Sequence, residues 1–177
     1  MRIAILTVSD RSWRGERADA SGPALVQAVI AQGWQVVETR ILPDDQPQLT
    51  AQLIQWADSD AVDVILTTGG TGFSHSDVTP EATNAVIQRA APGLAEAMRQ
   101  ASMQITPHAM LSRAVAGIRG QVLIINLPGS PRAALENLAV VIPVLPHAVQ
   151  LLSEDANAEA GHNLSSQKKG ESSNSAR

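Results

Sequence analysis

A glycine-rich stretch near the middle of the chain limits the possible folds most strongly. The predicted strand at residues 62–67 runs through Thr68 into Gly69-Gly70-Thr71-Gly72. A short apolar run of this kind is typical of a strand buried on both faces, as in a parallel sheet. Glycine can take positive φ and let an anion approach backbone amides, and threonine hydroxyls add donors. The stretch predicts a phosphate site at a strand end, and the alternative is a turn that only reverses the chain.

Two helix starts strengthen the phosphate interpretation. After the glycine stretch, Thr79 is expected to be the N-cap and Pro80 the first helical residue. The free N–H groups and positive dipole end of such a helix favour an anion. Ser130 and Pro131 repeat the design after another apolar run, although those residues taken alone favour an ordinary capped helix. The glycine stretch is not a Walker loop, because no Gly-Lys-Ser/Thr follows it.

The rest of the sequence alternates between strand and helix patterns. Strands are predicted at residues 3–8, 34–42, 62–67, 115–118 and 122–127. Helices are predicted at residues 21–33, 47–58 and 82–89, from 92, from 106, and in a last segment that ends near 152. This order indicates βαβ units with parallel pairing, so we predict an α/β fold. Arg119-Gly120 is expected to join the last two strands as an antiparallel hairpin at one side of the sheet.

Composition narrows the class of protein. The 177 residues are 44% apolar and carry a net charge of −4, which predicts one globular domain and does not favour nucleic-acid binding. Without cysteine the chain has no disulfide or thiolate metal site. No apolar stretch approaches the ~20 residues that span a bilayer, so we expect no membrane partner and a cytoplasmic location. We expect residues 1–152 to form the domain and residues 153–177 to be a disordered polar tail.

Four polar clusters follow predicted strands. In open α/β sheets ligands bind at the carboxyl ends of the strands, so these clusters are expected to meet there. The clusters are Ser9-Asp10-Arg11, Pro43-Asp44-Asp45, Thr67–Gly72 and Asn126–Ser130.

Carboxylates beside a phosphate cradle suggest a bridging cation. Mg²⁺ takes one or two carboxylates together with phosphate oxygens and waters. Asp44 and Asp77 are the first candidates for this role, ahead of Asp10, Asp45 and Glu81. The alternative for each residue is a solvated loop charge or a residue that favours a helix dipole.

Eight motifs in order resemble the molybdopterin-binding Mog/MoaB family, over about residues 3–152. They are Thr-Val-Ser-Asp-Arg (7–11), Asp-Ala-Ser-Gly-Pro (19–23), Pro-Asp-Asp (43–45), Thr-Thr-Gly-Gly-Thr-Gly (67–72), Asp-Val-Thr-Pro-Glu-Ala (77–82), Pro-Gly-Leu-Ala-Glu-Ala-Met-Arg (92–99), Ala-Met-Leu-Ser-Arg (109–113) and Ile-Asn-Leu-Pro-Gly-Ser-Pro (125–131).

The resemblance implies a three-layer α/β/α domain, assembled as a homotrimer, that acts in molybdenum cofactor biosynthesis. Proteins of the Mog type transfer AMP from Mg-ATP to the terminal phosphate of molybdopterin, releasing pyrophosphate, before hand-over to a molybdenum-insertion enzyme. Asp44 and Asp77 match the catalytic aspartates of the family and are the Mg²⁺ candidates. The implied molybdopterin-binding residues are Ser9, Asp10, Thr67, Thr68, Gly69, Gly70, Thr71, Gly72, Pro128, Gly129 and Ser130.

One position departs from the family pattern. Family members often carry Arg immediately before the Asp of Asp-Val-Thr-Pro, where this chain has Ser76 preceded by His75. Losing that guanidinium removes a bidentate phosphate contact, which another residue, such as a protonated His75, would have to replace. Two alternatives to the enzyme therefore stay open. One is a MoaB-type carrier that binds molybdopterin without adenylylating it, and the other is a scaffold that keeps the fold with a silent site.

Overall fold

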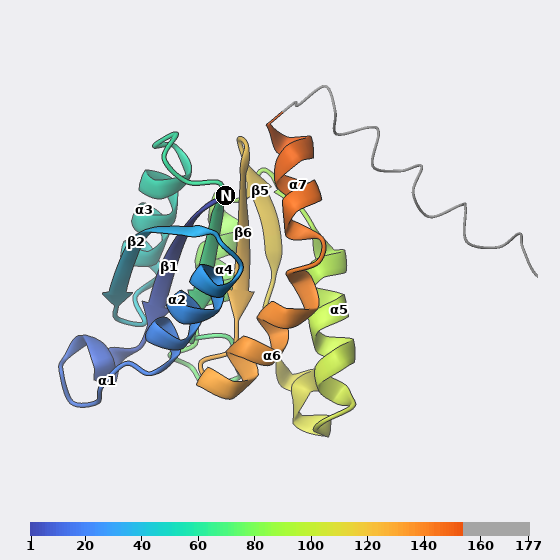
Figure 1. Ribbon diagram of the computed structural model, residues 1–177. Helices are drawn as coiled ribbons and strands as arrows, with labels where there is room; N and C mark the ends of the chain where they lie inside the picture. Colours follow the sequence, from blue (N-terminus) through green and yellow to red (C-terminus); the bar gives the residue numbers. More distant parts are fainter. Residues whose placement is uncertain (154–177) are drawn as a thin grey trace, which may run out of the picture.

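Six strands form one sheet in the order β2-β1-β3-β6-β5-β4 (Figure 1). The computed structural model describes residues 1–153, so the predicted tail lies almost entirely outside the described residues. The strands are β1 (Arg2–Val8), β2 (Gln35–Leu42), β3 (Val64–Thr68), β4 (Arg89–Ala90), β5 (Ala116–Arg119) and β6 (Val122–Leu127). The first four strands in the sheet are parallel to one another. β5 pairs antiparallel with β6, and β4 pairs antiparallel with β5. The predicted mostly parallel sheet with an antiparallel hairpin is confirmed. The sequence does not predict β4, because two residues leave no periodic pattern.

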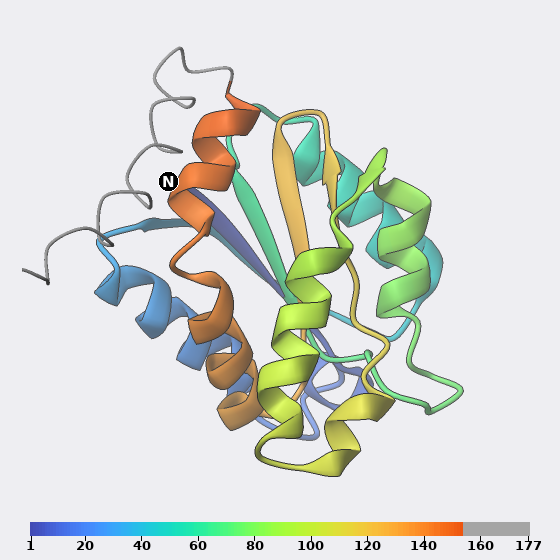
Figure 2. The ribbon, with the colours of Figure 1, turned by 90° about the vertical axis from the view of Figure 1, so that its right-hand side faces the viewer.

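Helices cover both faces of this sheet, which confirms the three-layer α/β/α fold (Figure 2). Buried side chains of α2, α5, α6 and α7 pack on one face, and those of α3 and α4 pack on the other. The helices are α1 (Asp10–Trp13), α2 (Ser21–Ala31), α3 (Gln46–Ala57), α4 (Thr79–Val86), α5 (Pro92–Met103), α6 (Pro131–Val141) and α7 (Leu145–Leu152), with a 3-10 helix, η1, at Pro107–Leu111.

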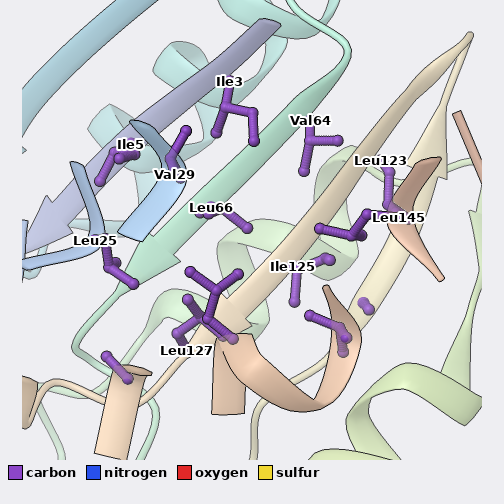
Figure 3. Packing of buried hydrophobic residues seen from close by; sticks show 14 of the residues in the cluster. Ile3, Ile5, Leu25, Val29, Val64, Leu66, Leu123, Ile125, Leu127 and Leu145 are labelled. Atoms are coloured by element: carbon purple, nitrogen blue, oxygen red, sulfur yellow. The ribbon is translucent and has the colours of Figure 1, made fainter. Parts of the chain in front are cut away.

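The two hydrophobic cores follow from the alternation of side chains along the central strands. In β1, Ile3 and Ile5 point into the core beneath α2, while Ala4 and Leu6 point into the core beneath α3. All four are at most 1% exposed, so the central strand is buried on both faces, as its continuous apolar run predicts. Figure 3 shows the first core, where Leu25 and Val29 of α2 contact the sheet.

The order of the strands creates a switch point between β1 and β3. The chain leaves β1 through α2 on one face to reach β2, then returns through α3 on the other face to β3 on the far side of β1. Connections that diverge in this way leave a crevice outside the carboxyl ends of the two central strands. The predicted polar clusters belong to these strand ends.

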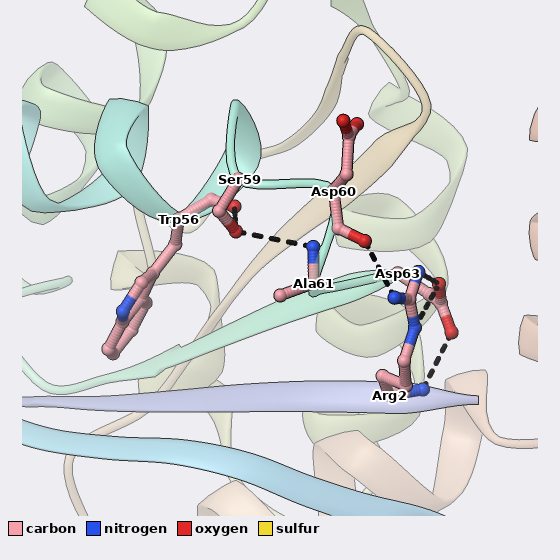
Figure 4. Close-up of polar contacts among 6 residues, drawn as sticks. All are labelled: Arg2, Trp56, Ser59, Asp60, Ala61 and Asp63. Carbon is pink, nitrogen blue, oxygen red and sulfur yellow. Dashed lines mark hydrogen bonds and ion pairs between the residues drawn. The ribbon is translucent and has the colours of Figure 1, made fainter.

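At the amino ends of the parallel strands, Arg2 at the start of β1 makes several hydrogen bonds (Figure 4). Its backbone amide donates to Asp63 Oδ2 at 2.6 Å, and its guanidinium donates to Asp63 Oδ1 and to the carbonyl of Asp60, each at 2.6 Å. These bonds join β1 to the connection between α3 and β3. The charged groups at this edge therefore pair with one another, far from the carboxyl ends of the strands.

Within residues 1–153 no single helix has the length and hydropathy to cross a membrane. Only α6 and α7 taken together pass by length and composition, and they are bent by 63° relative to each other. Both helices contribute buried side chains to the core on one face of the sheet.

Asn126 links the sheet to α4 from a fully buried position. Its amide nitrogen donates to Thr67 Oγ1 at 3.0 Å and to Thr83 Oγ1 at 2.9 Å. Its side-chain oxygen accepts from the Val115 amide at 3.2 Å. Asn126 and both threonines are 0% exposed, so no water can replace these bonds.

Asn126→Ala is expected to reduce the free energy of unfolding by about 2–3 kcal/mol, because it leaves buried donors and acceptors without partners. Urea unfolding, followed by circular dichroism, measures this change. Asn84→Ala on the exposed side of α4 is the control and should shift stability by no more than about 0.5 kcal/mol. Equal effects of the two substitutions would contradict the role given to Asn126.

Candidate active site

A cavity of about 480 Å³ lies at the carboxyl ends of the parallel strands. It is lined by segments that follow β1, β2, β3 and β6, as the sequence predicts. Eight of the predicted site residues line it: Ser9, Asp44, Thr68, Gly69, Gly70, Asp77, Gly129 and Ser130. The structure thus brings both predicted aspartates into one space with the glycine loop, here residues 69–72.

The other predicted binding residues do not line this cavity. Thr67 is 0% exposed and accepts the hydrogen bond from Asn126, so it supports the sheet. Thr71, Gly72 and Pro128 line a neighbouring cavity of about 280 Å³ beside α5 and η1. Asp10 lies next to the main cavity and contacts Asp44. The predicted ligand-binding set is therefore divided between two cavities.

Two glycines of the loop are required by their surroundings. Gly69 has φ +102°, and a Cβ there would lie 2.2 Å from the carbonyl oxygen of Val8. Gly70 has φ +62°, and a Cβ there would lie 2.4 Å from Thr79 Oγ1 and 3.0 Å from Asp44 Oδ1. Gly72, in contrast, does not take positive φ. A Cβ at Gly72 would instead lie 2.9 Å from Asp77 Oδ2, so this glycine makes room for a carboxylate.

Thr79 is not the N-cap of α4, contrary to the sequence prediction. The cap position is Val78, and its side chain makes no capping bond. Thr79 Oγ1 donates instead to the Gly69 carbonyl at 2.8 Å, and its amide donates to the Gly70 carbonyl at 3.1 Å. The hydroxyl fixes the glycine loop because the loop folds back onto the helix start.

Ser130 occupies the N-cap position of α6, as predicted, but its hydroxyl makes no capping bond. The preceding Gly129 lies against the glycine loop, where its Cβ would be 3.1 Å from the Cα of Gly69. Thr68 Oγ1 donates to the Pro128 carbonyl at 2.7 Å. These contacts hold the ends of β3 and β6 together, with the start of α6 at the cavity wall.

Asp10 and Asp44 bind each other's backbone. The Asp10 amide donates to Asp44 Oδ2 at 3.0 Å, and the Asp44 amide donates to Asp10 Oδ1 at 3.1 Å. This reciprocal pair joins the loops that follow β1 and β2. The next residue, Asp45, caps α3 by accepting from the Gln48 amide at 2.9 Å, which accounts for it without a metal.

Asp77 is positioned by its own loop and by Arg113. Its Oδ2 accepts from the Ser74 amide at 2.9 Å. The Arg113 guanidinium donates to the carbonyls of Gly72 and Asp77, each at 2.6 Å, and pairs with Glu81. The hydrogen bond from Arg113 lowers the pKa of the Glu81 carboxyl, so Glu81 is committed to this ion pair.

Two residues near the cavity escape the sequence-based list of site residues. Asp19 lines the cavity and accepts from Thr7 Oγ1 at 2.7 Å and from the amides of Ser21 and Gly22, each at 3.0 Å. Arg113 clamps the loop that carries Asp77. Both lie inside motifs of the resemblance, at residues 19–23 and 109–113, and that position was the available signal.

The carboxylates of Asp19, Asp44 and Asp77 line the cavity and dominate its charge. Burial raises the pKa of the Asp44 carboxyl, the nearby charges of Asp10 and Asp77 raise it further, and the bond from the Asp10 amide acts in the opposite direction. No group of three or more His, Asp or Glu side chains within residues 1–153 is arranged to hold a metal ion. Two carboxylates that destabilise each other's charge nevertheless fit a hard cation that takes its remaining ligands from phosphate and water.

Comparisons with known proteins show the family to which this chain is similar. The family model described as "Probable molybdopterin binding domain" matches residues 4–147. A molybdopterin adenylyltransferase of Helicobacter pylori strain J99 is 40% identical over 154 residues, covering 86% of this chain and 88% of that protein. The crystal structure of the molybdopterin biosynthesis enzyme MoaB from Thermus thermophilus has a TM-score of 0.82 and 47% identity, covering 87% of this chain and 97% of that one.

Some relatives are much longer proteins. Gephyrin of Dictyostelium discoideum is 43% identical over 161 residues, which is 85% of this chain but only 22% of gephyrin. The similarity to gephyrin therefore concerns one part of that protein.

Asp44→Asn is expected to raise the free energy of unfolding at pH 7. The folded-state pKa of Asp44 lies above its unfolded value, so ionisation costs stability as the pH rises through that interval, and the whole cost is present at neutral pH. The stability gained by Asp44→Asn should shrink as the pH falls toward roughly 4, where the carboxyl of the wild type begins to be protonated in the unfolded state as well as in the folded state. Urea unfolding in EDTA at several pH values measures it.

Asp45→Asn is the matched control, because it removes the same charge from the adjacent residue and asparagine is an equally good cap. It should leave the difference between pH 7 and pH 4 close to that of the wild type. A loss of stability in Asp44→Asn at pH 7 would show that the carboxylate is not strained in the folded protein.

Proposed function

Because this chain belongs to the family of molybdopterin-binding domains, we propose that it is a molybdopterin adenylyltransferase of molybdenum cofactor biosynthesis. It transfers AMP from Mg-ATP to the terminal phosphate of molybdopterin and releases pyrophosphate. One observation carries the proposal: a single cavity joins the backbone of Gly69 and Gly70, the start of α6, and the carboxylates of Asp44 and Asp77. Relatives named molybdopterin adenylyltransferase at 40% and 42% identity support the reaction.

The reaction joins two anions, so positioning is the main task of the protein. A terminal phosphate oxygen of molybdopterin attacks the α-phosphorus of ATP, the bond to the β-phosphate breaks, and the electron pair leaves with pyrophosphate. Holding both substrates in line makes this step effectively unimolecular. Amides of the glycine loop and of the α6 start donate to phosphate oxygens, where they stabilise the charge that spreads over the α-phosphate in the transition state.

Asp44 and Asp77 act as positioning groups in this proposal. The phosphate nucleophile is already ionised, so no general base is needed to remove a proton from it. The two carboxylates would hold Mg²⁺, which supplies charge neutralisation and Lewis-acid polarisation at the phosphates. The raised pKa of the Asp44 carboxyl supports this role, because a bound cation would offset the cost of burying the charge and the repulsion from Asp10 and Asp77.

Incubating the protein with molybdopterin, ATP and Mg²⁺ is expected to release pyrophosphate. Asp44→Asn and Asp77→Asn should each lower kcat/KM by about a hundredfold or more, the size of effect seen when one transition-state contact is lost. Asp45→Asn, which removes a neighbouring charge while keeping the helix cap, should retain activity. A continuous pyrophosphate assay measures all four proteins.

The MoaB-type carrier is the competing outcome. If the wild type binds molybdopterin but releases no pyrophosphate above background, the adenylyltransferase proposal fails and the carrier replaces it. If pyrophosphate appears and both aspartate substitutions leave the rate unchanged, the reaction stands and the assignment of Asp44 and Asp77 is wrong. If the wild type binds neither substrate, a scaffold with a silent site remains.

The proposal extends to assembly and location. A cytoplasmic homotrimer that passes adenylylated molybdopterin to a molybdenum-insertion enzyme is consistent with ATP as a substrate and with the exposed apolar side chains. Phe73 and Met110 are 68% and 63% exposed in the single chain, so both are available for contact with another copy.

Light scattering after size exclusion is expected to give the mass of three 18.6 kDa chains. Phe73→Ser and Met110→Ser should shift the equilibrium toward smaller species if these side chains lie between copies. A monomeric wild type at micromolar concentration would contradict the trimer and would leave the proposed reaction untouched.

A further inference from the structure

Among the described residues that line the main cavity, Arg17 is the only basic one. It lies in the connection between α1 and α2, where the turn at Gly15 has φ +74°. The amides of Glu16 and Arg17 donate to the carbonyl of Arg11 at 2.9 and 3.3 Å, so the backbone of this turn is fixed to the end of α1. The fold of the loop therefore places Arg17 at the cavity, and its exposed side chain reaches Ser9.

The guanidinium of Arg17 has donors to spare. Its hydrogen bond from Nη2 to Ser9 Oγ is 3.5 Å, which is long. No carboxylate within residues 1–153 lies within ion-pair distance of it. The neighbouring Arg14, in contrast, is paired with Glu16 at 2.9 Å. An arginine presents five N–H groups in a planar fork that matches two phosphate oxygens, and here most of that fork is unused.

The cavity needs a cation on this side. Three carboxylates line it, those of Asp19, Asp44 and Asp77, against the single guanidinium from the described part of the chain. The amides of the glycine loop and the α6 start carry partial charges, whereas each phosphate group of the proposed substrates carries at least one full negative charge. Neither His75 nor Ser76, on the segment before Asp77, lines the cavity, so that segment supplies no positive charge to it.

The geometry points to Arg17 as a residue that binds phosphate oxygens of a substrate, opposite the glycine loop. This inference rests on the proposed function for the identity of the phosphates, which belong to ATP or to molybdopterin. A bidentate guanidinium would both neutralise charge and fix the orientation of the phosphate group, and lysine would supply only a point charge. Ser9, beside Arg17 at the end of β1, would donate its hydroxyl to the same group.

Steady-state kinetics and equilibrium binding of Arg17→Gln test the inference. Losing a hydrogen-bonded charge contact costs about 1.5–3 kcal/mol, so kcat/KM should fall about tenfold to a hundredfold, and the affinity for one substrate should fall by a similar factor. A weaker Kd for ATP by calorimetry assigns Arg17 to ATP, and a weaker Kd for molybdopterin assigns it to the pterin phosphate. Arg17→Lys should restore part of the loss.

Arg14→Gln is the matched control, because it removes the same charge from the same loop at a residue that does not line the cavity. It should stay within twofold of the wild type in every measurement, and all three variants should unfold at the same urea concentration. Equal losses in Arg14→Gln and Arg17→Gln would reduce the effect to general electrostatic attraction and overturn the inference. So would an Arg17→Gln protein with unchanged affinity for both substrates.

The binding measurements separate this inference from the proposed reaction. If the wild type releases no pyrophosphate, the adenylyltransferase proposal fails, and weaker binding of ATP or molybdopterin by Arg17→Gln still supports the phosphate contact. If the reaction proceeds normally in Arg17→Gln, the reaction is supported and the role of Arg17 is refuted. A wild type that binds neither phosphate ligand refutes both.

Discussion

The glycine loop is held between two strand ends, and the site depends on that close contact. Gly69 lies so near the Val8 carbonyl that a side chain on it would overlap the end of β1, and its Cα lies so near Gly129 that a side chain on Gly129 would crowd the loop. The hydroxyls of Thr68 and Thr79 fasten the same loop to the turn after β6 and to the start of α4. Because both partners of these hydrogen bonds belong to the protein, the bonds orient the loop without a bound ligand. Preorganised donors of this kind cost no reorganisation when charge develops in a reaction.

The resemblance supplies the three layers, and the sequence pattern predicts the α/β class, the parallel sheet and the edge at which the polar clusters meet. It succeeds there because apolar runs, helix periodicity and the rule for carboxyl ends are local signals that the topology then combines. It fails where the role of a residue is decided by distant partners. Thr67 looks like its neighbour Thr68, yet one accepts from Asn126 in the interior and the other lies at the cavity. Thr79 matches an N-cap by sequence, but the loop that folds back on it takes its hydroxyl.

The roles of charged residues are also decided by distant partners that the sequence does not show. Sequence reasoning identifies Asp44 and Asp77 and separates them from Asp45, but it cannot find the arginines that complete the arrangement. Arg113 is 36 residues from Asp77 in the chain and donates to its carbonyl, whereas Arg17 reaches the cavity from a charged loop without a periodic pattern. Arg113 forms hydrogen bonds to the loop that carries Asp77, whereas Arg17 lines the cavity. Only the three-dimensional structure distinguishes the roles of the two arginines, since in the sequence Arg113 ends one motif and Arg17 precedes another.

The bonds between Asp10 and Asp44 tie the chemistry of the site to the outermost strand of the sheet. β2 has a neighbour on one side only, and most of its residues are partly or fully exposed. Strands in such positions separate from a sheet more easily than central ones, because fewer contacts hold them. If the end of β2 separates from β1, Asp44 leaves the cavity while the glycine loop, held by β3 and β6, keeps its shape. The shape of the glycine loop and the placement of the Asp44 carboxylate can therefore be lost independently, and the carboxylate whose charge is penalised by burial depends on the outermost strand.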